Sequence, residues 1–190
     1  KTTLQKKDLQ KQNLGQDFPF LMQFTPSVVT TSDAGAGIGY TGMRIRGSDP
    51  ERTNVTINGI PLNDAESQGV FWVNMPDFAS SVSSVDIQRG VGTSVNGAGA
   101  FGASVNITTE APSEEAYAET SNSVGSFNTL KNNVVFNTGT LADKFSFYGR
   151  LSKITSDGFI DNAFVDLKSF YLSGNYRSKA GDFTVNIFSG

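Results

Sequence analysis

The segment Val85-Asp86-Ile87-Gln88-Arg89-Gly90 alternates apolar and polar side chains and ends on a glycine. A glycine-rich run, Gly97-Ala98-Gly99-Ala100-Phe101-Gly102, follows it, and Ser104-Val105-Asn106-Ile107-Thr108 then resumes the alternation. Alternation with a period of two predicts strands, and glycine permits backbone angles closed to other residues, so the run predicts a tightly packed loop between them. The run also fits the dinucleotide pattern GxGxxG, but that fingerprint needs a helix to begin at the glycines. Because a strand follows instead, we reject a nucleotide site.

Short elements precede this unit. A helix is predicted within Lys6–Asn13, with a stop at Gly15, and a second short helix is opened by Asp17 and ended by Pro26. The second helix is expected to bury one apolar face, formed by Phe18, Phe20, Leu21 and Phe24. Short strands are predicted at Val28–Thr31, Met43–Arg46, Val55–Ile57, Val85–Gln88 and Val105–Thr109.

A tight hairpin is predicted at Asn58-Gly59, because both residues tolerate positive φ and apolar residues flank them. Pro61 lacks a backbone donor, which restricts the returning strand to the edge of a sheet. These elements together predict a small α+β domain over residues 1–112, large enough to form its own core.

The sequence changes character at Ala111-Pro112-Ser113, and residues 113–190 read as five long alternating segments. Two connections are short, at Gly139–Ala142 and Ser178–Gly181, whereas the one at Thr155–Val165 is longer. Short turns that alternate with longer loops are typical of antiparallel transmembrane β-barrel strands, although a soluble sandwich would also alternate. Five strands cannot close a barrel, so we expect the natural chain to continue, and Lys1 in place of Met suggests that an upstream segment has been removed.

The alternation assigns each side chain of these strands to one of two faces. The face expected to contact lipid carries Phe145, Phe147, Leu151, Phe170, Leu172, Val185 and Ile187. The face expected to point inward carries Ser146, Tyr148, Ser169, Tyr171 and Asn186. A third strand divides in the same way, with Leu130, Val134 and Phe136 opposite Lys131, Asn133 and Asn137.

Several motifs occur in an order that resembles the plug of TonB-dependent outer-membrane transporters. They are Phe20-Leu21, Thr25-Pro26-Ser27-Val28, Ile45-Arg46-Gly47, Asn58-Gly59-Ile60-Pro61-Leu62-Asn63-Asp64, Val85 to Gly90, the glycine-rich run and Val105-Asn106-Ile107. The match extends from Asp17 to Ile107. Departures occur in loops, where Asn58 replaces a usual Asp and Ala103 a usual Gly.

The resemblance implies an α+β plug domain inside a roughly 22-stranded transmembrane β-barrel in the outer membrane of a Gram-negative bacterium. It implies active import of a scarce solute, glycan or peptide, driven by a TonB-type energy-coupling protein that grips a segment upstream of this chain. It leaves a surface lipoprotein partner open, and it names neither the cargo nor the ligand-binding residues. It also implies that Arg46, Asp86 and Arg89 form a plug–barrel ionic cluster, and that the plug loops depend on glycines at Gly47, Gly59, Gly90, Gly97, Gly99 and Gly102.

Composition limits the chemistry. The chain of 190 residues has no His and no Cys, which excludes His-dependent triads, thiolate nucleophiles and thiolate metal sites within it. The net charge of −3 argues against nucleic acid, and the basic cluster of Lys6, Lys7 and Lys11 reads as the solvated face of a helix. We expect no enzyme activity, no cofactor and no resident metal, because the spacing of the acidic residues Asp77, Asp86, Glu114 and Glu115 does not suggest a catalytic pair.

Two alternatives remain open at this point. Loop acids at Asp157, Asp161 and Asp166 offer oxygen ligands to calcium, although acidic loops also serve solubility. A soluble β-rich surface adhesin or binding protein would show the same alternation as a barrel, and a requirement for detergent during extraction would separate the two.

Overall fold

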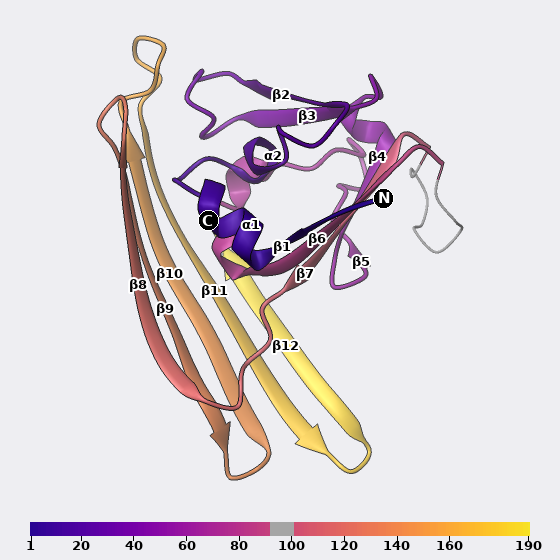
Figure 1. Ribbon diagram of the computed structural model, residues 1–190, viewed down its shortest axis with the longest axis vertical. Coiled ribbons are helices and arrows are strands. Elements are labelled where there is room, and N and C mark those ends of the chain that lie inside the picture. The colour runs from indigo at the N-terminus through magenta and orange to yellow at the C-terminus, as the bar shows by residue number, and fades with distance from the viewer. Residues whose placement is uncertain (92–100) are drawn as a thin grey trace.

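The computed structural model describes residues 1–91 and 101–190 and contains a long curved sheet with a smaller mixed domain against one of its faces (Figure 1). The small domain holds a five-stranded sheet in the order β1-β6-β7-β4-β5. Its strands are β1 Thr2–Gln5, β6 Val82–Arg89, β7 Ala103–Thr109, β4 Thr53–Ile57 and β5 Ile60–Pro61. The predicted α+β class is therefore confirmed for this part, and β4 and β7 are its parallel pair.

The predicted hairpin is present between β4 and β5. Asn58 and Gly59 both have positive φ, at 51° and 81°, which is the geometry that a two-residue turn requires. Pro61 lies in β5 at the edge of the sheet, as its missing donor predicts. The edge strand β1 was not predicted, because Lys1 to Gln5 are mostly polar and offer no hydrophobic alternation.

The remaining elements of the small domain cover this sheet. A separate hairpin joins β2 Val28–Ser32 to β3 Thr41–Ile45, and two short helices are α1 Lys6–Gln12 and α2 Phe18–Leu21. Three 3₁₀ helices are η1 Pro50–Arg52, η2 Trp72–Asn74 and η3 Phe78–Ser81.

The core confirms part of the apolar face predicted for the second helix. Phe18 stacks on Trp72 with ring centroids 5.1 Å apart, and Leu21 is buried beside them. Phe24, predicted to share this face, is instead 75% exposed, because α2 ends at Leu21 and the chain has already turned away.

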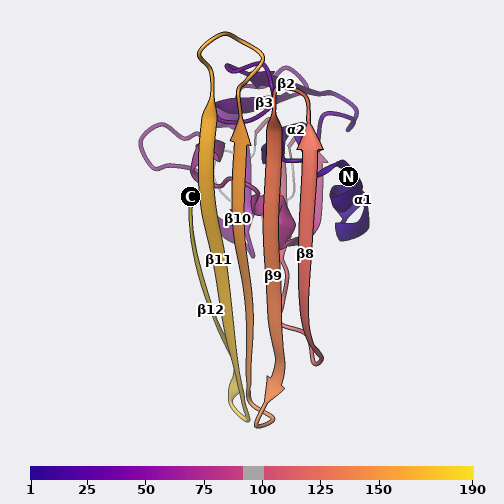
Figure 2. The same ribbon diagram turned by 90° about the vertical axis from the view of Figure 1, so that its left-hand side faces the viewer.

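Five antiparallel strands form the long sheet in the order β12-β11-β10-β9-β8 (Figure 2). They are β8 Ala116–Gly125, β9 Thr129–Leu141, β10 Phe145–Ser156, β11 Val165–Ser178 and β12 Gly181–Ser189. The turns β9–β10 and β11–β12 lie at one end, and the longer β10–β11 connection lies at the other (Figure 1). This arrangement confirms the predicted alternation of short and long connections.

The two faces of the long sheet differ as the sequence predicts. On β10, Phe147 and Leu151 point away from the small domain and are exposed, while Tyr148 and Arg150 point toward it and are buried. Tyr171 of β11 packs with Phe78 of η3 at a centroid distance of 6.1 Å, so the cores of the two parts are continuous.

The two sheets are joined by a short connection, since β7 ends at Thr109 and β8 begins at Ala116. The predicted boundary between residues 112 and 113 falls inside it. No helix in residues 1–91 or 101–190 is long and apolar enough to cross a membrane.

Candidate functional site: a buried ionic cluster between the two sheets

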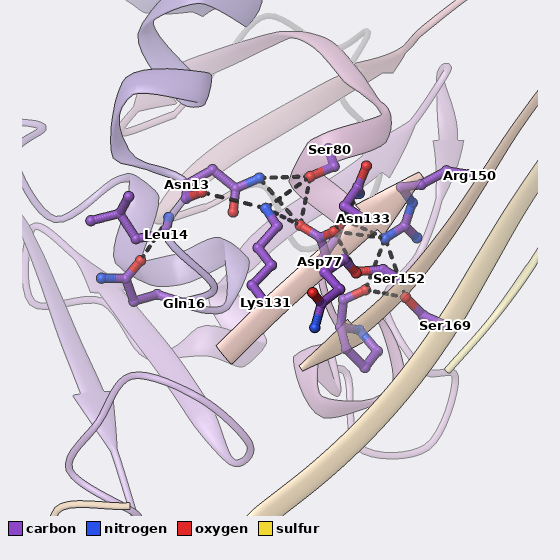
Figure 3. Close-up of polar contacts among 12 residues, drawn as sticks. Asn13, Leu14, Gln16, Asp77, Ser80, Lys131, Asn133, Arg150, Ser152 and Ser169 are labelled. Atoms are coloured by element: carbon purple, nitrogen blue, oxygen red, sulfur yellow. Dashed lines mark hydrogen bonds and ion pairs between the residues drawn. The ribbon is translucent and has the colours of Figure 1, made fainter. Parts of the chain in front are cut away.

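Asp77 stands at the point where the small domain meets the long sheet. It follows Pro76, precedes η3 and adopts a left-handed backbone with φ 53°. Asp and Asn are among the few non-glycine residues that tolerate this conformation, because their short side chains bond locally. With this backbone conformation, the Asp77 carboxylate lies against the inner face of β9 and β10 (Figure 3).

Four side chains of the long sheet converge on the Asp77 carboxylate. Lys131 Nζ lies 2.7 Å from Oδ1, and Arg150 Nη1 lies 3.4 Å from Oδ2. Asn133 Nδ2 and Ser152 Oγ donate hydrogen bonds to Oδ2 at 2.7 and 2.6 Å. Each carboxylate oxygen therefore has at least one partner from β9 or β10, and Oδ1 also accepts from Ser80 Oγ of the small domain at 2.6 Å.

The main chain beside Asp77 is held as well. Arg150 Nη1 donates to the carbonyl oxygen of Asp77 at 2.7 Å, and Ser169 Oγ of β11 donates to the carbonyl of Pro76 at 2.7 Å. Tyr148 donates its hydroxyl to the carbonyl of Ser80 at 3.3 Å. Side chains of three adjacent strands therefore bond to both the Asp77 side chain and the main chain of one turn of the small domain.

Electrostatics keep this acid ionised. Burial alone would raise the pKa of Asp77, but the charges of Lys131 and Arg150, with the hydrogen bonds from Lys131 and Ser152, outweigh it and lower the pKa to about 2. An acid with two cationic partners and no access to solvent has no free oxygen left for proton transfer. The arrangement therefore joins two parts of the molecule.

The end of α1 extends the cluster. Asn13, just after the helix, donates from Nδ2 to Ser80 Oγ at 2.9 Å and to Asp77 Oδ1 at 3.3 Å. Lys131 Nζ donates in turn to the carbonyl oxygen of Asn13 at 3.4 Å. We call Asp77, Lys131, Arg150 and their polar neighbours Asn13, Ser80, Asn133, Ser152 and Ser169 the anchor cluster.

The three charges singled out from the sequence do not pair with one another within the described residues. Asp86 pairs with Lys1 Nζ at 3.0 Å, and Arg89 donates to the carbonyl of Pro26 at 3.1 Å. Arg46 is exposed and lies over Gly90, where an added Cβ would come within 3.1 Å of its Nη1. Because Lys1, the residue before β1, pairs with the Asp86 carboxylate, the plug–barrel ionic cluster of these three charges stays a prediction.

The sequence carries a partial signal for the anchor cluster. Lys131 and Arg150 are charges on strand faces that were predicted to point inward, where a buried charge needs a partner. Asp77 carried no periodic signal, because it lies in an irregular stretch after Pro76.

The predicted loop glycines have clear geometry where the structure describes them. Gly47, Gly59 and Gly90 have positive φ, at 74°, 81° and 86°, and Gly97 and Gly99 lie outside the described residues. Gly102 is constrained by space, since a Cβ there would clash with Ser48 Cβ and approach the carbonyl oxygen of Arg52 at 3.0 Å.

The loop acids do not gather around a common point. Asp157 accepts a hydrogen bond from Asn128 at 2.6 Å, and Asp166 lies 3.7 Å from Lys153. Within the described ranges, no three acidic side chains come close enough together to hold a metal ion.

A second junction lies at the end with the longer connection. Phe159, between β10 and β11, donates its backbone N–H to the carbonyl of Ala34 in the β2–β3 loop at 3.2 Å. That loop is tied to α2 by Asp17, whose Oδ2 accepts from Thr41 Oγ1 at 2.9 Å. Burial raises the pKa of Asp17 to about 7, against smaller opposing effects of hydrogen bonds from Thr41 and the Gly39 backbone.

Comparison with protein families gives a match to the model described as the TonB-dependent Receptor Plug Domain, over residues 1–104. The chain is 27% identical over 174 residues to the probable TonB-dependent siderophore receptor PirA of Acinetobacter baumannii, covering 82% of this chain and 23% of that protein. It is 26% identical to the ferrienterobactin receptor of Escherichia coli, covering all of this chain and 26% of that protein. The chain thus spans about a quarter of the length of these relatives.

Solved structures share the fold at lower identity. The crystal structure of PirA from A. baumannii matches with a TM-score of 0.74 at 22% identity, covering 98% of this chain and 31% of that one. The pyoverdine outer membrane receptor FpvA from Pseudomonas aeruginosa, bound to pyoverdine, matches with a TM-score of 0.79 at 16% identity, covering 98% and 26%. Both parts of the chain, including the strands after residue 113, are therefore arranged as in these receptors.

Proposed function

Because the chain belongs to the TonB-dependent receptor plug domain family, we propose that the whole protein binds a ferric siderophore at the cell surface and imports it actively into the periplasm. The chain is an outer-membrane component of a Gram-negative bacterium. Residues 1–112 are its plug, and residues 113–190 are the first strands of a roughly 22-stranded barrel.

The anchor cluster carries this proposal. Asp77 of the plug pairs with Lys131 of β9 and Arg150 of β10, which fixes the plug on the inner face of the strands. A plug held in the lumen blocks free diffusion, and ligand binding shifts conformations only by its differential affinity for them. Net import then needs work from outside, which a TonB-type protein acting on a segment upstream of this chain would supply.

The cargo is proposed from the relatives, two of which are named as receptors for a siderophore and for ferrienterobactin. Glycan or peptide cargo and a surface lipoprotein partner remain predictions without specific support. We propose that transport leaves the cargo covalently unchanged, so the protein is not an enzyme and needs no cofactor.

The exposed face of the long sheet argues against the soluble adhesin. Leu151, Leu172, Val185 and Ile187 are each more than 40% exposed on the face turned away from the plug. A contiguous apolar face of this kind is costly in water and suits lipid.

The charges near the glycine-rich loop retain a proposed role. Arg46 is exposed, and in the described part of the chain Arg89 donates to the Pro26 carbonyl and to Thr2 Oγ1, so we propose that both side chains pair with acids on later barrel strands. We retain the plug–barrel ionic cluster of Arg46, Asp86 and Arg89 in this modified form.

The proposal is tested by iron uptake in cells that lack other siderophore receptors and express the whole protein. Radioactive iron is supplied as ferric enterobactin, as ferric pyoverdine or as ferric citrate. We expect uptake from at least one of the two siderophores. Cells that bind and import neither, while the protein is correctly inserted, would contradict the proposed cargo class.

A further inference from the structure

Two lysines lie opposite each other on the outer face of the long sheet, the face turned away from the plug. Lys153 of β10 is paired with Lys168 of β11 in the strand register, and both side chains are exposed. Side chains directly opposite on an antiparallel pair have Cβ atoms about 4.5–5.5 Å apart, and like charges at this spacing repel each other. In the part of the chain that the structure describes, Asp166 is the only acid within ion-pair distance of either lysine, at 3.7 Å from Lys153 Nζ. The pair therefore carries more positive charge than its described neighbours neutralise.

Two amide side chains extend this row across the sheet. Asn132 of β9 is opposite Lys153, Asn122 of β8 is opposite Asn132, and both amides are exposed. Strands β8 to β11 lie side by side in front of the plug (Figure 2). Ammonium and amide groups all donate hydrogen bonds, so the row suits an oxyanion with further polar groups beside it. We call Asn122, Asn132, Lys153 and Lys168 the donor row.

An apolar groove adjoins the donor row on the side of the short turns. Its volume is about 600 Å³, and its lining includes Val134, Leu151 and Phe170 together with the two lysines. Leu151 is opposite both Val134 and Phe170 in the register, so these three form the next row of the same face. Apolar side chains of this kind suit hydrocarbon. The surface therefore combines a cationic end with an apolar end, as an anionic lipid requires.

The position along the strands places the donor row on the extracellular side of the membrane. Phe145, Tyr176 and Phe183 lie on the same face near the short turns, with successive ring centroids 4.9 and 6.5 Å apart. In outer-membrane barrels the short turns are periplasmic, and aromatic girdles mark the membrane interfaces. Lys153 lies further along β10 than Phe145, at a height of roughly 20 Å for a rise of about 3.3 Å per residue and a tilt of about 40°. Because the apolar band is about 25 Å tall, the flexible lysine stems reach the outer headgroup layer.

We propose that the donor row binds the phosphate groups of lipopolysaccharide, the phosphorylated glycolipid of the outer leaflet, and that the apolar groove takes its acyl chains. A phosphate between Lys153 and Lys168 neutralises both ammonium groups and relieves their repulsion. Across four strands about 4.8 Å apart, the row spans roughly 14 Å, which is wider than the single phosphate diester of a glycerophospholipid. A phosphorylated disaccharide fills this width, with its hydroxyls against Asn122 and Asn132.

This inference goes beyond the proposed transport function. It depends on where the strands lie in the outer membrane and not on the cargo. A protein that binds lipopolysaccharide at the donor row but imports no siderophore would contradict the proposed cargo and leave this site in place.

Lipid binding by the purified whole protein tests the site. Lys153→Gln with Lys168→Gln removes both charges, and its affinity for lipid A, the phosphorylated anchor of lipopolysaccharide, is compared with that of the parent by native mass spectrometry in neutral detergent. We expect the double variant to bind roughly tenfold to thirtyfold more weakly. Lys153→Arg with Lys168→Arg keeps both charges and should bind within about twofold of the parent. Unchanged affinity of the glutamine variant would overturn the inference.

The matched control removes two lysines from the other end of the same strands. Lys144→Gln with Lys179→Gln changes exposed residues of the β9–β10 and β11–β12 turns. Its net charge equals that of the Lys153→Gln and Lys168→Gln variant, so a general effect of charge would weaken lipid binding equally in both. We expect the control to bind lipid A as the parent does. Equal losses in the two variants would overturn the donor row as a site.

The choice of ligand separates lipopolysaccharide from other sources of phosphate. Dephosphorylated lipid A and phosphatidylglycerol should each bind the parent at least about tenfold more weakly than phosphorylated lipid A, and excess inorganic phosphate should not displace it. Equal binding with and without the phosphates would refute the role of the lysines. Equally tight phosphatidylglycerol, or displacement by inorganic phosphate, would mean that the row takes phosphate from another source, and would overturn the assignment to lipopolysaccharide.

Discussion

Lys131 Nζ on β9 lies 2.7 Å from Asp77 Oδ1 in the plug, with the two side chains only 2% and 0% exposed. A pair so deeply buried adds little over an apolar pair of the same shape, but it is costly to break on one side only. The pair therefore fixes where the plug sits on the strands, and its disruption should be easy to measure.

Replacing Asp77 with Asn should destabilise the seated plug by about 3–5 kcal/mol, because it strands the charges of Lys131 and Arg150. Asn also tolerates the left-handed backbone at this position, so the change tests the charge and not the turn. Urea unfolding of the whole protein in detergent measures the effect. Asp166→Asn, which removes an exposed partner of Lys153, is the control and should change stability by ~0–1 kcal/mol. Equal effects of the two changes would show that Asp77 is not an anchor.

Acidification should weaken the same contact. The pKa of Asp77 is lowered to about 2, so its contribution is fully present above the usual Asp value near 4 and is lost as the pH falls through 2. The unfolding free energy of the parent should therefore fall more steeply below about pH 4 than that of Asp77→Asn. Parallel pH profiles of the unfolding free energy for the two proteins would contradict the role of Asp77 in holding the plug on the strands.

Asp17 should behave in the opposite way. Its pKa is raised to about 7, so the folded plug binds more protons than the unfolded chain between about pH 4 and 7, and stability falls as the pH rises through that window. Asp17→Asn should remove this slope and stabilise the protein at pH 8 by about 1–3 kcal/mol, since one pKa unit corresponds to about 1.4 kcal/mol. Thr41 can still donate to the Asn oxygen. A variant that is less stable than the parent at pH 8 would show that the ionised carboxylate is needed.

Adjacent residues on β12 test which face contacts lipid. Val185 is on the exposed apolar face, and Thr184, its neighbour at nearly the same depth, is on the opposite face. Val185→Arg should cost up to ~2–4 kcal/mol in a bilayer, and Thr184→Arg much less. Folding into lipid vesicles at graded urea concentrations measures both. The reverse order would mean that the faces are assigned the wrong way round.

Gly102 should be intolerant of any side chain. An added Cβ meets Ser48 Cβ and the Arg52 carbonyl, so Gly102→Ala is expected to destabilise the plug by about 1–3 kcal/mol. Gly69→Ala is the matched change, because the nearest atom to a Cβ there is 3.8 Å away. Limited proteolysis measures the stability of the plug in both variants. Equal resistance of the two variants to proteolysis would contradict a steric role for Gly102.

Local sequence patterns explain which features of the fold could be predicted from the sequence. The β10 alternation of Phe147 and Leu151 with Tyr148 and Arg150 follows directly from the pleat, and the Asn58-Gly59 turn follows from its backbone preference. These features depend on residues close in sequence, and the structure confirms both the strand faces and the turn.

The anchor cluster depends instead on contacts between distant residues. Asp77 is 54 positions before Lys131 and 73 before Arg150, and it lies in a turn without a repeating pattern. Asp86, by contrast, lies in a recognisable motif and was expected in a plug–barrel ionic cluster, and within the described residues it pairs with Lys1, the residue before β1. Sequence patterns therefore identified which faces point inward, and only the assembled fold determined which charges meet.

Energy dependence of accumulation is the measurement that tests the central claim most directly. Whole cells expressing the complete protein are given the ferric siderophore that they bind, with and without a protonophore, and again after deletion of the segment upstream of this chain. In the proposed function a plug seated on the barrel by Asp77 closes the lumen, so surface binding should persist in all cases while accumulation is lost with the protonophore or the deletion. Accumulation that continues unchanged under both treatments would mean that the protein is a passive channel, and would contradict the account.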